Sequence, residues 1–258
     1  GKLRKLRRLT AHESSFLLKH APGTFKVTMP TPILNFRIQE TIPEPYTSLE
    51  EIQQDITDIF RDEMVALAGE GITYIQMDKV PLQYMNPQSR EELKTKGIDP
   101  DKAFAEEVAI ENSCYDAVRR DGIILAMHFC RGSRVAWQGG TGAYDAIAEQ
   151  AFIALHANRY LLEYDTEKAG GFESLRFVPK EKSVHLGLVS SKNRELESQD
   201  DLLRRIEEAS QYISIDQLGI GPQCGFQGAS ERDGAHMTID DQRRKMELIV
   251  DTARKVWG

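Results

Sequence analysis

Apolar stretches typical of β-strands alternate with helical stretches along almost the whole chain. We expect strands at residues 24–29, 72–77, 123–127, 160–164, 184–189 and 217–220. Helical patterns occupy residues 48–69, 101–120, 143–157, 200–212 and 239–256. Because parallel strands need long crossovers, this alternation predicts an α/β protein with a parallel sheet. In such folds ligands bind at the carboxyl ends of the strands, so residues that end a strand are the first candidates for function.

The number of strand–helix units leaves two architectures open. An amphipathic helix is expected over residues 1–22, where it ends at Pro22-Gly23. Six strand–helix units follow, whereas a TIM (β/α)8 barrel has eight and about 250 residues. The chain therefore folds either as an open doubly wound sheet or as a barrel whose first units are missing from this chain. No linker-like segment interrupts the pattern, so residues 1–258 are expected to form a single domain.

Charge, hydropathy and cysteine count argue against several classes of protein. The 258 residues include 33 Lys and Arg against 40 Asp and Glu, a net charge of −7. Since nucleic-acid binders concentrate positive charge, we expect no nucleic-acid partner. No apolar run approaches the roughly 20 residues that span a bilayer, and no signal peptide opens the chain, so we expect no membrane partner and a cytoplasmic location. Three cysteines are too few and too odd in number for a disulfide framework.

A His-x-Cys pair ends the third expected strand. Alternate residues of a strand face the same side, so His128 and Cys130 are expected to point together from its carboxyl end. Imidazole and thiolate are both ligands of zinc. Taken alone, the pair is explained equally well as two core residues of a strand.

Two further polar residues end other strands. Glu163 follows two leucines in the fourth strand, where a carboxylate is costly to bury unless it is paired or bound to a metal. The alternative is an ordinary acid that reaches solvent. Cys224 lies in the Pro-Gln-Cys-Gly loop after the last strand, and its alternative is a small buried thiol. Cys114, inside the helical pattern 101–120, is expected only to pack.

Together these strand-end residues would supply one nitrogen, two sulfurs and one oxygen, which is a credible zinc ligand set. The ligands span 96 residues, from position 128 to position 224. Structural zinc sites more often use close Cys-x-x-Cys pairs, so dispersed ligands indicate a site that exchanges a ligand. Two thiolates and a carboxylate bound to Zn²⁺ leave one net negative charge on the centre. Such a zinc activates water poorly but suits a thiolate, so thiol alkylation is favoured over hydrolysis.

A resemblance to the catalytic barrel of cobalamin-independent methionine synthases is carried by the segments MHFCRGSR, YLLEYDTE, RRIEEASQYI and QLGIGPQCGF. TYIQMD is similar to the family's Ile-Gln-x-Asp strand. The chain is most similar in pattern to the short, single-barrel methionine synthase-like proteins, from about residue 13 to the C-terminus. The resemblance implies a TIM-type (β/α)8 barrel whose first one or two βα units are missing from this chain.

The resemblance also implies a reaction. His128, Cys130, Glu163 and Cys224 would bind Zn²⁺, and Asp78 of the IQMD strand would hold the amino group of an amino-acid thiol such as homocysteine. The implied reaction transfers a methyl group from 5-methyltetrahydrofolate, or a related donor, to the thiol and gives methionine.

Three further residues receive expected functions. Arg131 is expected to pair with a substrate carboxylate. Asp165 is expected to support catalysis by orienting Glu163. Phe36 ends MPTPILNF, which resembles the family segment whose last aromatic residue stacks on the pterin of the donor. A homodimer is expected at the level of the family alone.

Departures from the family pattern keep other functions open. Phe36 stands where methionine synthases have a Trp, and a smaller ring is a weaker stacking platform. Lys79 stands where an acidic residue often follows Ile-Gln-x-Asp. The family's opening Gly-Ser loop, which grips the amino acid, is not in this chain. One alternative is zinc-dependent transfer of another electrophile to a thiol, as in epoxide-opening coenzyme M transfer. The other is a non-catalytic zinc-bound barrel.

Overall fold

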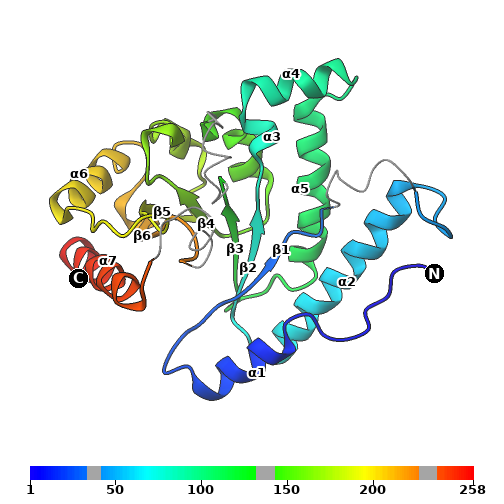
Figure 1. Cartoon of the computed structure of the whole chain (residues 1–258), viewed down its shortest axis with the longest axis horizontal. Coiled ribbons are helices and arrows are strands. Elements are labelled where there is room, and N and C mark those ends of the chain that lie inside the picture. The colour runs from blue at the N-terminus through cyan, green and yellow to red at the C-terminus, as the bar shows by residue number, and fades with distance from the viewer. Residues whose placement is uncertain (34–41, 132–142, 227–236) are drawn as a thin grey trace. The chain divides into compact units, whose positions relative to one another are not determined.

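A computed structural model of the protein describes residues 1–33, 42–131, 143–226 and 237–258. Its sheet has six strands: β1 (Val27–Pro30), β2 (Tyr74–Lys79), β3 (Ile124–Phe129), β4 (Arg159–Glu163), β5 (Ser183–Val189) and β6 (Leu218–Pro222). They are hydrogen-bonded in chain order (Figure 1), and the pairs β1–β2, β4–β5 and β5–β6 are parallel. The predicted α/β class is confirmed, and each expected strand is present.

Helices separate the strands, as the sequence pattern predicts. The α-helices are α1 (Ala11–His20), α2 (Leu49–Gly69), α3 (Leu82–Met85), α4 (Pro87–Thr95), α5 (Pro100–Asp116), α6 (Gln199–Ala209) and α7 (Ile239–Trp257). The sequence pattern did not predict α3 and α4. Within the described ranges, no helix combines the length and the apolar composition that a membrane crossing requires.

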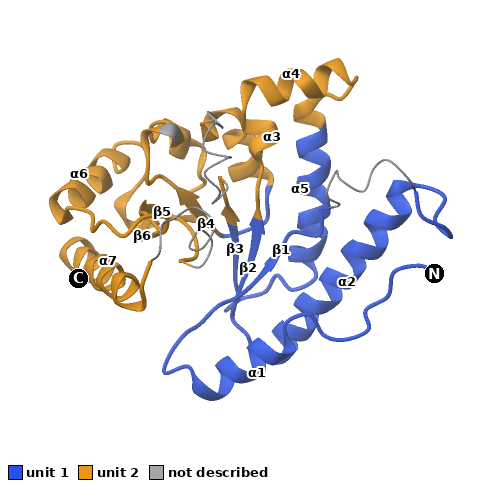
Figure 2. Ribbon diagram, viewed as in Figure 1, with its two compact units in different colours: residues 1–78, 103–127, 155–158 blue, residues 79–102, 128–154, 159–258 orange. Residues whose placement is uncertain are grey.

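The chain divides into two compact units, which Figure 2 shows in different colours. Unit 1 comprises residues 1–78, 103–127 and 155–158, and unit 2 comprises residues 79–102, 128–154 and 159–258. The single domain expected over residues 1–258 stays a prediction.

In unit 1, helix α2 has the boundaries that its capping residues predict. The Ser48 side chain accepts a hydrogen bond from the Glu51 backbone N–H at 3.3 Å, which satisfies one of the free donors of the first turn. The helix ends at Gly69, and Gly71 adopts a φ of +87°, a conformation that glycine adopts without strain. Met64 and Leu67 on this helix are fully buried, so one face of α2 contributes to the core of the unit.

The start of α1 differs from the expectation. A helix was expected over residues 1–22, but α1 begins only at Ala11. The carboxylate of Glu63 is fully buried and accepts hydrogen bonds from the Arg8 side chain and from the backbone and hydroxyl of Thr10. These tertiary bonds hold the residues before α1 against α2, and they outweigh the weak helical preference of a short, basic segment.

In unit 2, strand β5 lies between β4 and β6. The register pairs Glu163 with Gly187 and Gly187 with Gly221, so the three carboxyl ends lie in one row. Apolar side chains such as Leu162 and Leu186 are almost fully buried. Helix α7 packs against β6 and α6 (Figure 1). The strand ends that carry the predicted ligands are therefore supported by a packed core.

The helix expected over residues 143–157 is replaced by a 3-10 turn at Tyr144–Ala146 and a π-helical segment at Gln150–Ala154. The hydroxyl of Tyr160 donates to the carbonyl oxygens of Ala151 and Phe152, and the Lys182 ammonium also donates to Phe152. Because side chains from outside the segment occupy these carbonyls, the regular α-helical bonding pattern is broken there.

Candidate metal centre

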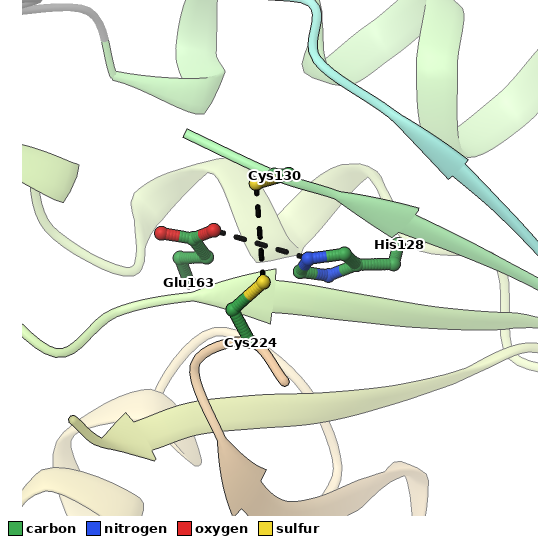
Figure 3. Close-up of side chains that lie close together, drawn as sticks. All are labelled: His128, Cys130, Glu163 and Cys224. Carbon is green, nitrogen blue, oxygen red and sulfur yellow. Dashed lines mark hydrogen bonds and ion pairs between the residues drawn. The ribbon is translucent and has the colours of Figure 1, made fainter. Parts of the chain in front are cut away.

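Four side chains from three strand ends converge in unit 2 (Figure 3). His128 lies on β3 and Cys130 follows it, Glu163 ends β4, and Cys224 follows β6. One potential ligand atom from each of the four lies within 4.8 Å of all the others. The sequence predicts this set, and the structure brings the four side chains together.

The imidazole of His128 is held in one orientation. Its Nδ1 lies 3.1 Å from the carbonyl oxygen of Leu161 on the neighbouring strand. Since a carbonyl can only accept, the proton must be on Nδ1, and Nε2 then presents a lone pair. Nε2 lies 3.9 Å from Oε1 of Glu163, on the side where the cluster forms. This is the tautomer that a metal-binding histidine needs.

The two sulfurs lie 4.0 Å apart, between Sγ of Cys130 and Sγ of Cys224. The backbone N–H of Cys130 donates to the Lys79 carbonyl at 2.8 Å, and the N–H of Gln223 donates to the Val189 carbonyl at 2.8 Å, so the chain on either side is fixed. A hydrogen bond from the Cys130 thiol lowers the pKa of the Cys224 thiol. The site thus favours a thiolate, the form in which cysteine binds a metal.

The carboxylate of Glu163 is fully buried. The backbone N–H of Arg131 donates to its Oε1 at 2.9 Å, and the ammonium of Lys192 lies 3.5 Å from its Oε2. Burial raises the pKa of Glu163, while the charge of Lys192 opposes that rise. A buried carboxylate that is neither hydrated by solvent nor fully neutralised by a neighbouring positive charge is suited to bind a metal cation.

The donor set fits zinc. A tetrahedral zinc ion with Zn–S bonds of about 2.3 Å holds two sulfurs about 3.8 Å apart. The observed 4.0 Å between the sulfurs of Cys130 and Cys224 is close to that value. A nitrogen and an oxygen bound at about 2.0–2.1 Å lie about 3.4 Å apart. The 3.9 Å between His128 and Glu163 therefore requires only a small side-chain movement.

The other predicted site residues have different surroundings. Arg131 is buried, and its guanidinium lies 5.9 Å from the centroid of the Tyr144 ring. Asp165 has a side chain only 4% exposed and lies 3.6 Å from Lys192. Asp78 belongs to unit 1, where it accepts a hydrogen bond from Gln76 at 2.6 Å.

Phe36, the residue expected to bind the methyl donor, lies outside the described residues. Its function stays a prediction.

The sequence reasoning missed Lys192 and Tyr144. Lys192 follows β5 by three residues, so the rule that searched strand ends for polar groups would have included it. Tyr144 lies fifteen positions after Phe129, in an apolar helical pattern that gives no sign of a polar function. Its hydroxyl nevertheless contacts the backbone of the centre.

Comparison with known proteins places the chain in a family. Residues 27–253 match the family described as "Cobalamin-independent synthase, Catalytic domain". The chain is 36% identical over 240 residues to YxjG of Bacillus subtilis, and the alignment covers 91% of this chain and 62% of that protein. It is 25% identical over 207 residues to a methionine synthase of Thermococcus kodakarensis, which covers 80% of this chain and 52% of that protein.

The fold is also similar to that of a solved structure. A B12-independent methionine synthase from a Shewanella species, in complex with selenomethionine, superposes with a TM-score of 0.74 at 17% identity, covering 99% of this chain and 69% of that one. The chain spans 62% of the length of YxjG, so it corresponds to part of such relatives. With most of its length matched, the protein belongs to the catalytic-domain family of cobalamin-independent methionine synthases.

Proposed function

We propose that the protein is a zinc-dependent S-methyltransferase that transfers a methyl group to a thiol such as homocysteine. The observation that carries this proposal is the convergence of His128, Cys130, Glu163 and Cys224 within 4.8 Å. The family match and the likeness to methionine synthases support the reaction class. We propose 5-methyltetrahydrofolate or a related compound as the donor, and methionine as the product when homocysteine is the acceptor.

Zinc at this site would bind the thiol substrate as a thiolate near neutral pH. In the proposed reaction the sulfur attacks the methyl carbon in line, so the sulfur–carbon bond forms as the bond between the methyl group and the donor nitrogen breaks. The proton that leaves the thiol balances the proton that the donor nitrogen takes up. Positioning of the two substrates supplies much of the rate in such a displacement.

The chain's own residues have separate tasks in this proposal. Arg131 pairs with the carboxylate of the acceptor, and Asp78 holds its amino group. Lys192 and Asp165 keep the Glu163 carboxylate in place, which the distances of 3.5 Å and 3.6 Å from Lys192 support. Phe36 stacks on the donor. The proposed setting for these residues is a TIM-type barrel that includes the six strands.

A comparison of two cysteine variants tests the ligand assignment. Cys224→Ser replaces a thiolate ligand with a neutral hydroxyl, so this variant should lose most of its bound zinc and all measurable methyl transfer. Cys114→Ser is the matched control, because Cys114 is fully buried in unit 1 and its thiol donates to the Thr57 carbonyl, a bond that a hydroxyl can also make.

The measurements are zinc content by elemental mass spectrometry and methyl transfer from 5-methyltetrahydrofolate to homocysteine. The wild-type protein and Cys114→Ser should both hold about one zinc ion per chain. If Cys224→Ser retains the zinc content of the wild type, Cys224 is not a ligand. If the wild type binds zinc but does not methylate homocysteine, the proposed acceptor or donor is wrong.

A further inference from the structure

One buried hydroxyl connects the two strands that carry three of the four candidate ligands. Tyr144 is 1% exposed, and its hydroxyl donates to the carbonyl of Phe129 at 3.0 Å. The same oxygen accepts a hydrogen bond from the backbone N–H of Glu163 at 2.9 Å. Phe129 lies between His128 and Cys130 in the sequence. The hydroxyl is thus bonded to the backbone beside two ligands and to the backbone of a third.

This bridge connects two strand ends through a single oxygen atom. Direct ladder bonds between neighbouring strands join an N–H and a C=O at about 2.9 Å. Here the C=O of Phe129 and the N–H of Glu163 each bond to the phenolic oxygen, which holds them farther apart than one direct bond would. A metal with ligands on both strands needs such a separation, together with a means of keeping it constant.

The ring that carries the hydroxyl is itself firmly held. The Tyr144 ring packs against the Tyr164 ring, with 5.4 Å between their centroids, and the guanidinium of Arg131 lies over its face. The backbone N–H of Arg131 also donates to the Glu163 carboxylate. Since a fully packed side chain has few alternative rotamers, the position of the hydroxyl is well defined.

We propose that Tyr144 is a positioning residue of the metal centre, whose hydroxyl fixes the separation between the His128–Cys130 segment and Glu163. The inference rests on the proposed zinc site and adds to it a residue that binds neither metal nor substrate. Tyr144 acts through the backbone of the ligands. Its loss should therefore weaken metal binding before it affects the fold as a whole.

The test compares Tyr144→Phe with Tyr160→Phe. Tyr160 is also fully buried, and its hydroxyl donates to the carbonyls of Ala151 and Phe152 and accepts from Lys182. Both substitutions delete one buried hydroxyl, and the control loses at least as many hydrogen bonds. The Tyr144 hydroxyl bonds to the backbone of a candidate ligand, Glu163, whereas the described bonds of the Tyr160 hydroxyl go to Ala151, Phe152 and Lys182. The comparison therefore separates a general loss of stability from a loss specific to the centre.

Three quantities are measured for each variant: the zinc dissociation constant by competition with a chelator, the visible d–d absorption of the cobalt-substituted protein, and the melting temperature. Outer partners of metal ligands typically contribute about 10- to 100-fold in affinity. We expect Tyr144→Phe to bind zinc about 10- to 100-fold more weakly and to show an altered cobalt spectrum. Tyr160→Phe should keep the wild-type affinity and spectrum, even if its melting temperature falls.

The inference is overturned if Tyr144→Phe keeps the wild-type zinc affinity, or if both variants lose affinity equally. Failure of the wild type to bind zinc would instead refute the proposed function, so the two failures are distinguishable. If Tyr144→Phe does not fold, the residue is replaced by 4-aminophenylalanine, which keeps the ring and a donor but is a poor acceptor. An affinity equal to that of the wild type would then refute the bridging function.

Discussion

Single side chains with the same chemistry behave differently here because their surroundings differ. Cys114 is fully buried, and burial raises the pKa of its thiol to about 11. The pKa of the Cys224 thiol is instead lowered to about 4, because the thiol of Cys130 donates a hydrogen bond to it. The two thiols therefore differ in charge at neutral pH, although both are cysteines of one chain.

This difference predicts the order of alkylation in the metal-free protein. An ordinary thiol with a pKa of about 8.5 is almost entirely protonated at about pH 6.5. With its pKa lowered to about 4, Cys224 is a thiolate at that pH and loses its charge only as the pH falls towards 4. Iodoacetamide should therefore modify Cys224 first, with a rate that changes little between about pH 6.5 and pH 8. Cys114 should stay unmodified over that range.

Peptide mass spectrometry of timed samples measures the rate at each cysteine, and the unfolded protein gives the reference rate for a free thiol. Added zinc should slow the modification of Cys224, because the metal competes for the same sulfur. Equal rates at Cys224 and Cys114 in the folded protein would show that the environment of Cys224 does not lower its pKa.

The four candidate ligands could be predicted because one simple rule applies to each of them. Polar residues at the carboxyl ends of parallel strands meet at one edge of the sheet. Because alternate residues of a strand face the same side, His128 and Cys130 point together. The convergence of the side chains confirms this reasoning, while their function as ligands stays a prediction. Tyr144 could not be predicted, since its position depends on the path of the chain between β3 and β4, which no local pattern encodes.

Among the secondary-structure elements, strands were more predictable than helices. Strand β3 and the carboxyl half of β5 are short runs buried on both faces, while β1 alternates buried and exposed residues, and both patterns are typical of strands. The segment before α1 and the segment at Gln150–Ala154 differ from expectation where tertiary bonds compete with local preference. Glu63 binds the segment before α1, and Tyr160 binds carbonyls of the segment at Gln150–Ala154. Such contacts come from side chains outside the segment itself and leave no trace in the periodicity of the sequence.

The backbone next to Gly187 of strand β5 approaches this glycine so closely that we expect a substitution there to destabilise the protein. A Cβ atom on Gly187 would lie 2.6 Å from Cα of Gln223 and 2.8 Å from the carbonyl oxygen of Leu162. Gly187→Ala must therefore displace backbone next to Cys224, and overpacking of this kind destabilises by about 1–3 kcal/mol. Gly221→Ala is the matched control, because a Cβ there meets nothing within 4 Å although Gly221 lies in the same row of the sheet.

Urea unfolding and zinc titration together check this expectation. Gly187→Ala should lower both the free energy of unfolding and the affinity for zinc, while Gly221→Ala should leave both close to those of the wild type. If Gly187→Ala keeps the wild-type free energy of unfolding, the carboxyl end of β6 can move away from β5 at no cost in stability. The close approach at Gly187 would then not be required for the metal centre.

For the molecule as a whole, the candidate centre lies inside one compact unit. All four ligand residues belong to unit 2, and they are drawn from three strand ends within a single hydrogen-bonded sheet. The family match extends well beyond these residues, to positions 27–253. A metal bound there would connect segments 96 residues apart, so it would report on the fold of the unit as well as on its chemistry.

Zinc X-ray absorption on the purified protein, before and after addition of homocysteine, shows whether a bound zinc ion takes up the thiol substrate through sulfur. We expect two sulfur neighbours, from Cys130 and Cys224, without homocysteine and three with it. Zinc that keeps two sulfur neighbours in the presence of homocysteine would rule out homocysteine as the acceptor. A protein that binds no zinc would refute the proposed function.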